Sequence, residues 1–290
     1  MPVGVIDVGS NTVRVLVVRD GREIFSRRKM LRLGASVEKF GRIPDEKLHE
    51  TRDVVREFAE AARSAGAHPV EVLITSPGRQ AENGADLLAA LSRAGDCDAR
   101  ILSAVEEGLL AFKGALTAVS PPARRLVAVV DVGGGSAQVV VGTRRGGAGW
   151  ARSIDIGSQR LTSRLLQDDP PGPAAVTAAQ AEVERYLDEL DVPAPRTALT
   201  VGGSARALKR LAGSRLDGPA LEALIELLGT TPSAELVEEH DVDPDRVRTM
   251  AAGAIILAGI QRRLDVPLKV VRAGLREGAL LELAAKRAAA

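Results

Sequence analysis

Two stretches of the chain share one pattern: an apolar run ends near an aspartate, a turn of small residues follows, and a second valine-rich run begins. One stretch covers residues 126–142 and reads LVAVVDVGGGSAQVVVG, with Asp131 before the turn. The other covers residues 3–18 and reads VGVIDVGSNTVRVLVV, with Asp7 in the same place. Short runs rich in valine predict strands. Two such units predict a duplicated domain whose halves face each other across a cleft.

The turns have the composition of an anion site. Gly133, Gly134 and Gly135 can take backbone angles closed to other residues and leave no side chain in the way. Such a turn points several N–H groups at one spot, which suits phosphate. Asp7 and Asp131 end buried strands, where an ionised carboxylate needs a cation or hydrogen-bond donors. Phosphate with a metal ion accounts for both features, whereas one such unit alone fits an ordinary glycine-rich hairpin equally well.

Length and linker composition predict two domains. A chain of 290 residues corresponds to about two domains of roughly 150 residues each. The segment Ser120–Arg125 (SPPARR) is the one convincing linker and precedes the second aspartate unit. We therefore predict an N-terminal domain over residues 1–122 and a C-terminal domain over residues 123–290.

Composition excludes several classes of function. The chain is 45% hydrophobic and 27% charged, as is typical of globular proteins, and its net charge of +1 gives no overall attraction to nucleic acid or membrane. Aromatic residues make up 2%, too few for base-stacking modules. Cys97 is the single cysteine, which excludes a disulfide within the chain. The start of the chain resembles no signal peptide, and the apolar segment Met250–Ile260 is shorter than the ~20 residues of a membrane span. We expect a cytoplasmic protein.

Periodicity predicts alternating strands and helices between these motifs. We expect three antiparallel strands in residues 3–29, further strands at 70–75, 100–103, 126–131, 139–141, 150–156, 196–201 and 269–272, and a turn at 76–79. We expect helices at 44–65, 82–93, 105–118, 176–190, 204–211, 221–228, 234–240, 246–264 and 275–288.

Three local features each allow a structural and a functional interpretation. The basic run of Arg27, Arg28 and Lys29 either protects an edge strand from aggregation or holds an anionic substrate. Glu106 and Glu107 stand in the first turn of a helix, where the helix dipole alone favours negative charge. The segment Gly202–Ser204 joins a strand to a helix and offers helix N-terminal N–H groups to an anion. The three histidines lie far apart, so neither a histidine metal site nor a Ser–His–Asp triad is readable.

The order and spacing of these motifs resemble the exopolyphosphatase / guanosine pentaphosphate phosphatase family, a branch of the actin-like ATPase superfamily. The resemblance covers nearly the whole chain. It rests on segments 7–12, 32–34, 79–81, 103–108, 131–136, 157–161, 202–208 and 276–278. It implies an α/β protein of two duplicated actin-like (ribonuclease H-like) domains, each with a mixed sheet flanked by helices, around an interdomain cleft.

The resemblance also implies an activity and roles for residues. It implies Mg²⁺-dependent removal of the terminal phosphate of inorganic polyphosphate, or of the 5′-terminal phosphate of guanosine pentaphosphate (pppGpp), by a homodimer. Glu107 would be the base that activates water, Arg79 would neutralise the scissile phosphate, and Asp7 and Asp131 would hold the metal. The implied phosphate-binding residues are Gly9, Ser10, Asn11, Arg32, Gly133, Gly134, Gly135, Ser136, Gly203 and Ser204.

One position departs from the family. Family members commonly have glutamate two residues after the turn serine, and this chain has Gln138 after Ser136 and Ala137. Glutamine keeps the shape but loses the negative charge and the ability to take a proton. Two rival interpretations stay open: a kinase or ATPase of the same superfamily, and a regulator that binds polyphosphate or guanosine polyphosphates and barely hydrolyses them.

Overall fold

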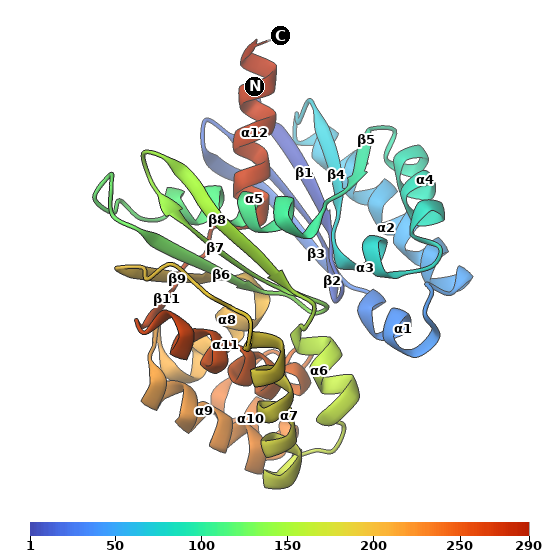
Figure 1. The fold of residues 1–290 in the computed structure, drawn as a ribbon. Helices are drawn as coiled ribbons and strands as arrows, with labels where there is room; N and C mark the ends of the chain where they lie inside the picture. The colour runs from blue at the N-terminus through green and yellow to red at the C-terminus, as the bar shows by residue number, and fades with distance from the viewer. Residues whose placement is uncertain (290) are drawn as a thin grey trace.

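The computed structural model describes residues 1–289 and contains two mixed β-sheets, each covered by helices (Figure 1). The strand order is β3–β2–β1–β4–β5 in the first sheet and β10–β11–β9–β6–β7–β8 in the second. In both sheets an antiparallel meander is continued on one side by parallel strands, at β1 and β4 in the first and at β6 and β9 in the second. The predicted class, a duplicated α/β fold with two mixed sheets flanked by helices, is confirmed.

The strands of the first sheet are β1 (Val3–Val8), β2 (Thr12–Arg19), β3 (Arg22–Met30), β4 (Val70–Ile74) and β5 (Asp98–Ile101). The strands of the second sheet are β6 (Val127–Val132), β7 (Ala137–Thr143), β8 (Gly147–Ile154), β9 (Thr197–Val201), β10 (Arg215–Leu216) and β11 (Leu268–Val270).

The helices up to the start of the second sheet are α1 (Leu33–Phe40), α2 (Asp45–Ser64), α3 (Ser76–Gln80), α4 (Gly84–Gly95) and α5 (Ala104–Thr117). Those that follow are α6 (Ser158–Leu165), α7 (Gly172–Leu187), α8 (Gly202–Ala212), α9 (Gly218–Thr230), α10 (Ser233–His240), a 3₁₀ turn at Val247–Thr249, α11 (Met250–Leu264) and α12 (Leu275–Ala289).

Strand register puts the two repeated aspartates at equivalent positions. Asp7 on β1 lies opposite Arg14 on β2, and Asp131 on β6 lies opposite Gln138 on β7. Each aspartate is the last residue but one of its strand, so both carboxylates emerge at the strand end that leads into the small-residue turn. The repeat seen in the sequence is therefore a repeat in the structure.

Two short helices are absent from the sequence-based prediction, and one predicted turn is wrong. Helices α1 and α6 span eight residues each, and both begin beside a turn of the duplicated units. Residues 76–79, predicted as a turn, form the five-residue helix α3 with Pro77 in its first turn. Segments this short offer too few residues for a helical period to show, so tertiary contacts decide their conformation.

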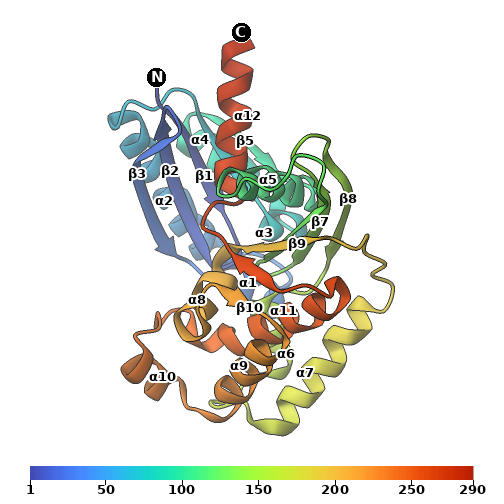
Figure 2. The same ribbon diagram turned by 90° about the vertical axis from the view of Figure 1, so that its left-hand side faces the viewer.

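Helices α5 and α12 lie between the two sheets and connect them (Figure 2). Phe112 and its apolar neighbours on α5 pack against β6, β7 and β9, while Leu280 and its neighbours on α12 pack against β1 and β2. The domain boundary between residues 122 and 123 stays a prediction. Helix α12 belongs to the predicted C-terminal domain but packs on the first sheet, which lies in the predicted N-terminal domain. This packing sets the position of the N-terminus of α5.

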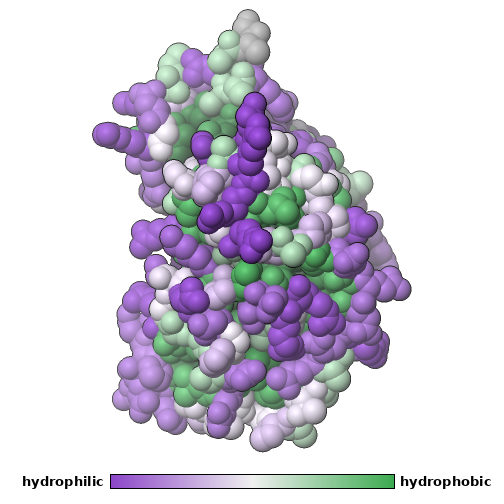
Figure 3. All heavy atoms as spheres, turned by 60° about the vertical axis from the view of Figure 1, so that its left-hand side comes forward, coloured by the Kyte–Doolittle hydropathy of each residue, from purple (hydrophilic) through white to green (hydrophobic). Residues whose placement is uncertain are grey.

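The surface shows no broad apolar face in the view of Figure 3, where hydrophobic patches are broken up by hydrophilic side chains. No helix within residues 1–289 combines the length and the apolar character needed to cross a bilayer.

The α5–α12 contact generates a prediction about stability. A Cβ at Gly278 on α12 would lie 1.9 Å from the carbonyl oxygen of Leu110 on α5, so the two backbones meet there. We expect Gly278→Ala to lower the free energy of unfolding by about 1–3 kcal/mol in urea denaturation, although alanine is the better helix former, because the helices must separate. Gly149→Ala, where a Cβ meets nothing within 4 Å, is the control. Unchanged stability of the Gly278 variant would contradict this packing argument.

Candidate active site

The ends of the two repeated units meet in one polar pocket. Both aspartates, both turns and the N-terminus of α5 contribute to its walls. Of the predicted site residues, the pocket is lined by Asp7, Gly9, Ser10, Asn11, Glu107, Asp131, Gly133, Gly134, Ser136, Gly203 and Ser204. The structure therefore brings together the three acids on which the sequence-based hypothesis depends.

The two turns are closed by the same hydrogen bond. The Gly9 amide donates to the Thr12 carbonyl at 3.0 Å, and the Gly133 amide donates to the Ser136 carbonyl at 3.0 Å. These two amides therefore serve to close their turns. Binding of phosphate by the residues that follow them stays a prediction.

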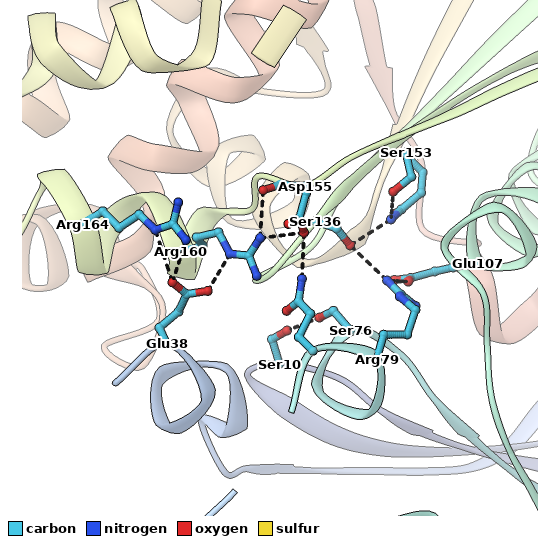
Figure 4. A network of polar contacts seen from close by, with 12 residues as sticks. Ser10, Glu38, Ser76, Arg79, Glu107, Ser136, Ser153, Asp155, Arg160 and Arg164 are labelled. Carbon is cyan, nitrogen blue, oxygen red and sulfur yellow. Dashed lines mark hydrogen bonds and ion pairs between the residues drawn. The ribbon is translucent and has the colours of Figure 1, made fainter. Parts of the chain in front are cut away.

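Glycine lets the turns approach each other closely. A Cβ at Gly134 would lie 2.8 Å from the Ser10 Cβ, and one at Gly135 would lie 2.7 Å from the Ser76 hydroxyl. The Ser10 and Ser76 hydroxyls are themselves 2.5 Å apart (Figure 4). Gly135 thus packs between the turns and is absent from the pocket lining.

Glu107 is held at the pocket by the start of α5 and by Arg79. Ser103 caps this helix in a reciprocal arrangement with Glu106, which leaves the next residue, Glu107, to turn inward. Its carboxylate lies 2.8 Å from an Arg79 guanidinium nitrogen (Figure 4). Arg79 also donates to the Leu102 carbonyl at 2.8 Å. Arg79 is fixed beside the base candidate and lies outside the pocket lining.

Burial makes Glu107 unusually basic. Removal from water raises the pKa of Glu107 to about 7, with a further increase from Asp131, while the Arg79 guanidinium opposes the shift. A carboxylate with a pKa near neutrality can accept a proton from water and return it to solvent. The dipole interpretation suffices for Glu106, which is half exposed, but it leaves the burial of Glu107 unexplained.

Asp7 and Asp131 share the base of the pocket. Desolvation raises the pKa of Asp131 to about 6 and also raises that of Asp7, while nearby arginines oppose both shifts. Gly202 makes room for the Asp131 carboxylate, since a Cβ at residue 202 would lie 2.2 Å from Asp131 Oδ1. No cluster of three or more His, Cys, Asp or Glu side chains suited to a metal occurs within residues 1–289. Two desolvated carboxylates nevertheless fit Mg²⁺, which is commonly bound by one or two carboxylates together with phosphate oxygens.

Five arginines that were not among the predicted site residues converge on the same pocket. They are Arg14, Arg206, Arg246, Arg272 and Arg276. Burial, followed by the charges of neighbouring arginines, lowers the pKa of Arg14 to about 9 and that of Arg206 to about 10. Guanidinium groups that oppose one another's charge in this way create a strong preference for an anionic ligand. Signals were available, because Arg14 is the single charge in the apolar run 12–18, and Arg206 and Arg276 lie in segments that carry the family resemblance.

Arg32 lies elsewhere. Its side chain is 58% exposed, pairs with Asp245 at 3.2 Å and is absent from the pocket lining. Its backbone lies close to the site, because the Leu31 and Arg32 amides both donate to the Asn11 carbonyl. Arg32 therefore supports the first turn through its main chain.

Gln138 occupies a buried place beside Asp131. Its amide donates to the Ser136 hydroxyl at 2.9 Å, and its Oε1 has no hydrogen-bond partner in the part of the chain that the structure describes. The Arg79 guanidinium donates to the same Ser136 hydroxyl at 3.3 Å. With two donors directed at its oxygen, Ser136 has its own proton available for a ligand in the pocket.

Polar contacts hold the two sheets together beside the pocket. Glu38 on α1 pairs with Arg160 at 2.5 Å and with Arg164 at 3.2 Å on α6, and Gln80 donates to Asp155 at 2.8 Å (Figure 4). The two short helices missing from the prediction, α1 and α6, thus join the two halves.

Two mixed sheets with repeated turns, and a pocket of carboxylates and arginines between those turns, define a duplicated α/β protein with a charged site between its halves. The model of the Ppx/GppA phosphatase family matches residues 15–287, and the chain belongs to this family.

Known relatives and solved structures agree with this assignment. Exopolyphosphatase 1 of Mycobacterium tuberculosis is 30% identical over 303 residues, covering 97% of this chain and 88% of that protein. Guanosine-5′-triphosphate,3′-diphosphate pyrophosphatase of Aeromonas salmonicida is 26% identical over 292 residues, covering 96% of this chain and 58% of that protein. The crystal structure of an exopolyphosphatase-like protein has a TM-score of 0.91 at 26% identity, covering 99% of both chains. The Aquifex aeolicus member of the Ppx/GppA family has a TM-score of 0.83 at 26% identity, covering 99% of this chain and 98% of that one.

The arginine cluster generates a prediction about anion binding. We expect Arg206→Gln to weaken binding of tripolyphosphate by about 1.5–3 kcal/mol in isothermal titration calorimetry, the usual contribution of a hydrogen bond to a charged group. Without ligand the variant should melt no lower than the parent, because a repulsive charge is removed from the pocket. Arg210→Gln on the same helix, where the side chain is 64% exposed, is the control. Equal losses in both variants would show that Arg206 does not contact the anion.

Proposed function

We propose that this protein is a phosphohydrolase that releases the terminal phosphate of inorganic polyphosphate. The observation that carries the proposal is the position of Glu107, a buried carboxylate with a raised pKa, in one pocket with three further carboxylates, Asp7, Asp131 and Glu277, and five arginines. Phosphoryl transfer to water needs charge neutralisation and in-line geometry more than a covalent helper, and the arginines of this pocket suit the first of these needs. The exopolyphosphatase names of the relatives at about 30% identity support the same substrate.

In the proposed reaction, arginines neutralise the terminal phosphates while the turn residues orient them. Glu107 takes a proton from a water molecule as the water oxygen bonds to the terminal phosphorus. The bridging P–O bond breaks, so that orthophosphate and a chain shorter by one unit leave. Arg79 acts as a positioning residue, since it holds the Glu107 carboxylate and donates to Ser136.

Mg²⁺ is part of the proposal, with Asp7 and Asp131 as the residues that hold it. Bound there, the ion would supply a Lewis acid and a counter-charge for phosphate oxygens. Gln138 stands where a third carboxylate is common in the family, which predicts weak metal binding. Dimerisation also stays a prediction.

Conversion of pppGpp to ppGpp is the second candidate. Both substrates end in the same phosphoanhydride group, and one relative is named for pppGpp hydrolysis. The proposal is tested by measuring phosphate release from long-chain polyphosphate, pppGpp and ATP with Mg²⁺. A kcat/KM highest for polyphosphate supports it. Preference for pppGpp selects the second candidate, preference for ATP selects the kinase or ATPase interpretation, and binding of polyphosphate without release selects a regulator.

Glu107→Gln should separate binding from chemistry. Because the amide cannot accept the proton of water, we expect kcat to fall by about 10²–10⁴-fold while affinity for tripolyphosphate changes little. Glu106→Gln is the control, because this neighbour caps the helix and faces solvent; it should keep kcat and nearly all of the stability, since glutamine can make the same capping hydrogen bond. Full hydrolysis by the Glu107 variant would remove the proposed base.

The pH dependence should follow Glu107. The base acts in its ionised form, and its pKa is raised to about 7, so kcat/KM should rise with pH up to neutrality and level off above it. Below that point we expect kcat/KM to fall about tenfold per pH unit. Initial rates measured from about pH 5 to pH 8 check this, and a profile that is flat across this range would contradict the assigned ionisation.

A further inference from the structure

Five exposed arginines gather at the end of the second sheet that lies opposite the candidate active site. We call them the arginine pole: Arg124, Arg125, Arg144, Arg145 and Arg196. They come from three segments that are distant in the sequence, namely the linker before β6, the turn after β7 and the loop before β9.

The fold holds these segments together. Strands β9, β6 and β7 are neighbours in the sheet, and Val127 at the start of β6 pairs with both flanking strands. Backbone hydrogen bonds continue the pairing beyond the strands, since the Arg145 amide donates to the Ala123 carbonyl at 2.9 Å and the Arg196 amide donates to the Leu126 carbonyl at 3.0 Å. Backbone pairing therefore fixes the three segments of the pole beside one another. Figure 1 shows the β7–β8 turn far from the ends of β1 and β2.

The charge of the pole is uncompensated. None of its five guanidinium groups forms an ion pair within residues 1–289, whereas many exposed arginines elsewhere do, as Arg27 does with Glu57. The sequence explains the difference, because the segments 108–130, 132–154 and 192–216 contain no aspartate or glutamate. A chain of net charge +1 thus concentrates five positive charges on one surface. Such a concentration creates a local potential that attracts polyanions.

The pole is separate from the pocket. Strand β6 runs from the pole at Val127 to the pocket at Asp131 and Val132, and six residues at about 3.3 Å each separate the two by roughly 20 Å. Exposed Arg152 lies between them on the edge strand β8. Only a ligand much longer than a few phosphate units can reach both.

We propose that the arginine pole is a second binding site, which holds the distal part of a long inorganic polyphosphate chain while its end occupies the pocket. The proposal rests on the proposed function for the identity of the chain. Guanidinium groups match phosphate oxygens in pairs, and a flexible linear polyanion can follow loops that carry no groove.

The composition of the pole favours this ligand over two other polyanions. Its one aromatic neighbour, Trp150, is covered by the Arg152 guanidinium 5.5 Å from the ring centre, so it offers no open platform to bases. No helix projects from the pole to enter a DNA groove. Leu126 is the one large exposed apolar side chain in the three segments, too little for insertion into a lipid surface.

The test measures binding without turnover. Long-chain polyphosphate and tripolyphosphate are titrated, in EDTA, into Glu107→Gln protein that carries Arg124→Gln, Arg125→Gln, Arg144→Gln and Arg145→Gln. The control carries Arg52→Gln, Arg56→Gln, Arg185→Gln and Arg215→Gln, an equal loss of positive charge outside the pole. We expect the pole variant to bind the long chain at least about fivefold more weakly at low salt, with little difference near 1 M salt. Affinity for tripolyphosphate should stay unchanged.

Each other outcome decides against the proposal. Equal long-chain affinity in the pole variant and the control overturns it, and so does an equal loss for tripolyphosphate, which would indicate damage to the pocket. Tighter pole-dependent binding of single-stranded DNA or of phosphatidylglycerol vesicles overturns the assignment to polyphosphate. If the four-site variant melts early, Arg144→Gln with Arg145→Gln in the exposed turn replaces it.

The outcomes for the two proposals are distinguishable. Wild-type protein that releases no phosphate, together with weakened long-chain binding by the pole variant, rejects the proposed function and keeps the pole. Phosphate release with unchanged long-chain affinity rejects the pole and keeps the function.

Discussion

The close approach of the two repeated turns is the constraint on which the rest of the structure depends. At the contact, Gly134 lies against Ser10 with no space for a Cβ, and the Ser10 and Ser76 hydroxyls meet at 2.5 Å. This contact brings the ends of β1 and β6 together and places Asp7 and Asp131 in one pocket. Any residue larger than glycine at this point would separate the halves and the two carboxylates with them. The glycines of the second turn are therefore required first by packing, and only then by any ligand.

The charged groups of the resulting pocket do not fully neutralise one another. Desolvation raises the pKa values of Glu107, Asp7 and Asp131, while desolvation and the charges of neighbouring arginines lower those of Arg14 and Arg206. Acids and arginines at this density do not satisfy one another fully, since each shift goes in the direction that disfavours the charged form. An anion shared among the arginines relieves their repulsion, and a cation between the aspartates does the same for theirs. The two ligands thus stabilise the same site through opposite charges.

The sequence revealed the repeated units and most of the long elements, because runs of valine and helical periods of ten or more residues carry a strong signal. It did not reveal α1, α6 or α3, whose few residues are fixed by contacts such as that of Glu38 with Arg160. It located the three acids through their motifs, yet missed the arginines. Whether the side chain of Arg206 on a helix or of Arg272 after a strand turns inward depends on how the halves pack, which the pattern of a single sequence does not record. Arg32 was predicted from its motif to bind phosphate, but it contributes to the site through its main chain, whose amide donates to the Asn11 carbonyl.

The duplication also gives a physical meaning to Gln138. It stands opposite Asp131 just as Arg14 stands opposite Asp7, so the two copies of one position carry a cation in the first half and a neutral amide in the second. A glutamate there would add a third carboxylate beside Asp131 and strengthen the hold on a metal ion. It would also lower the net positive charge that Arg14 and its neighbours direct at the phosphates. With glutamine, the balance moves from cation binding toward anion binding, and the Ser136 hydroxyl, which accepts from both Gln138 and Arg79, keeps its proton for the phosphate. The chain therefore relies more on guanidinium groups, and less on carboxylates, to neutralise a phosphate chain in this pocket.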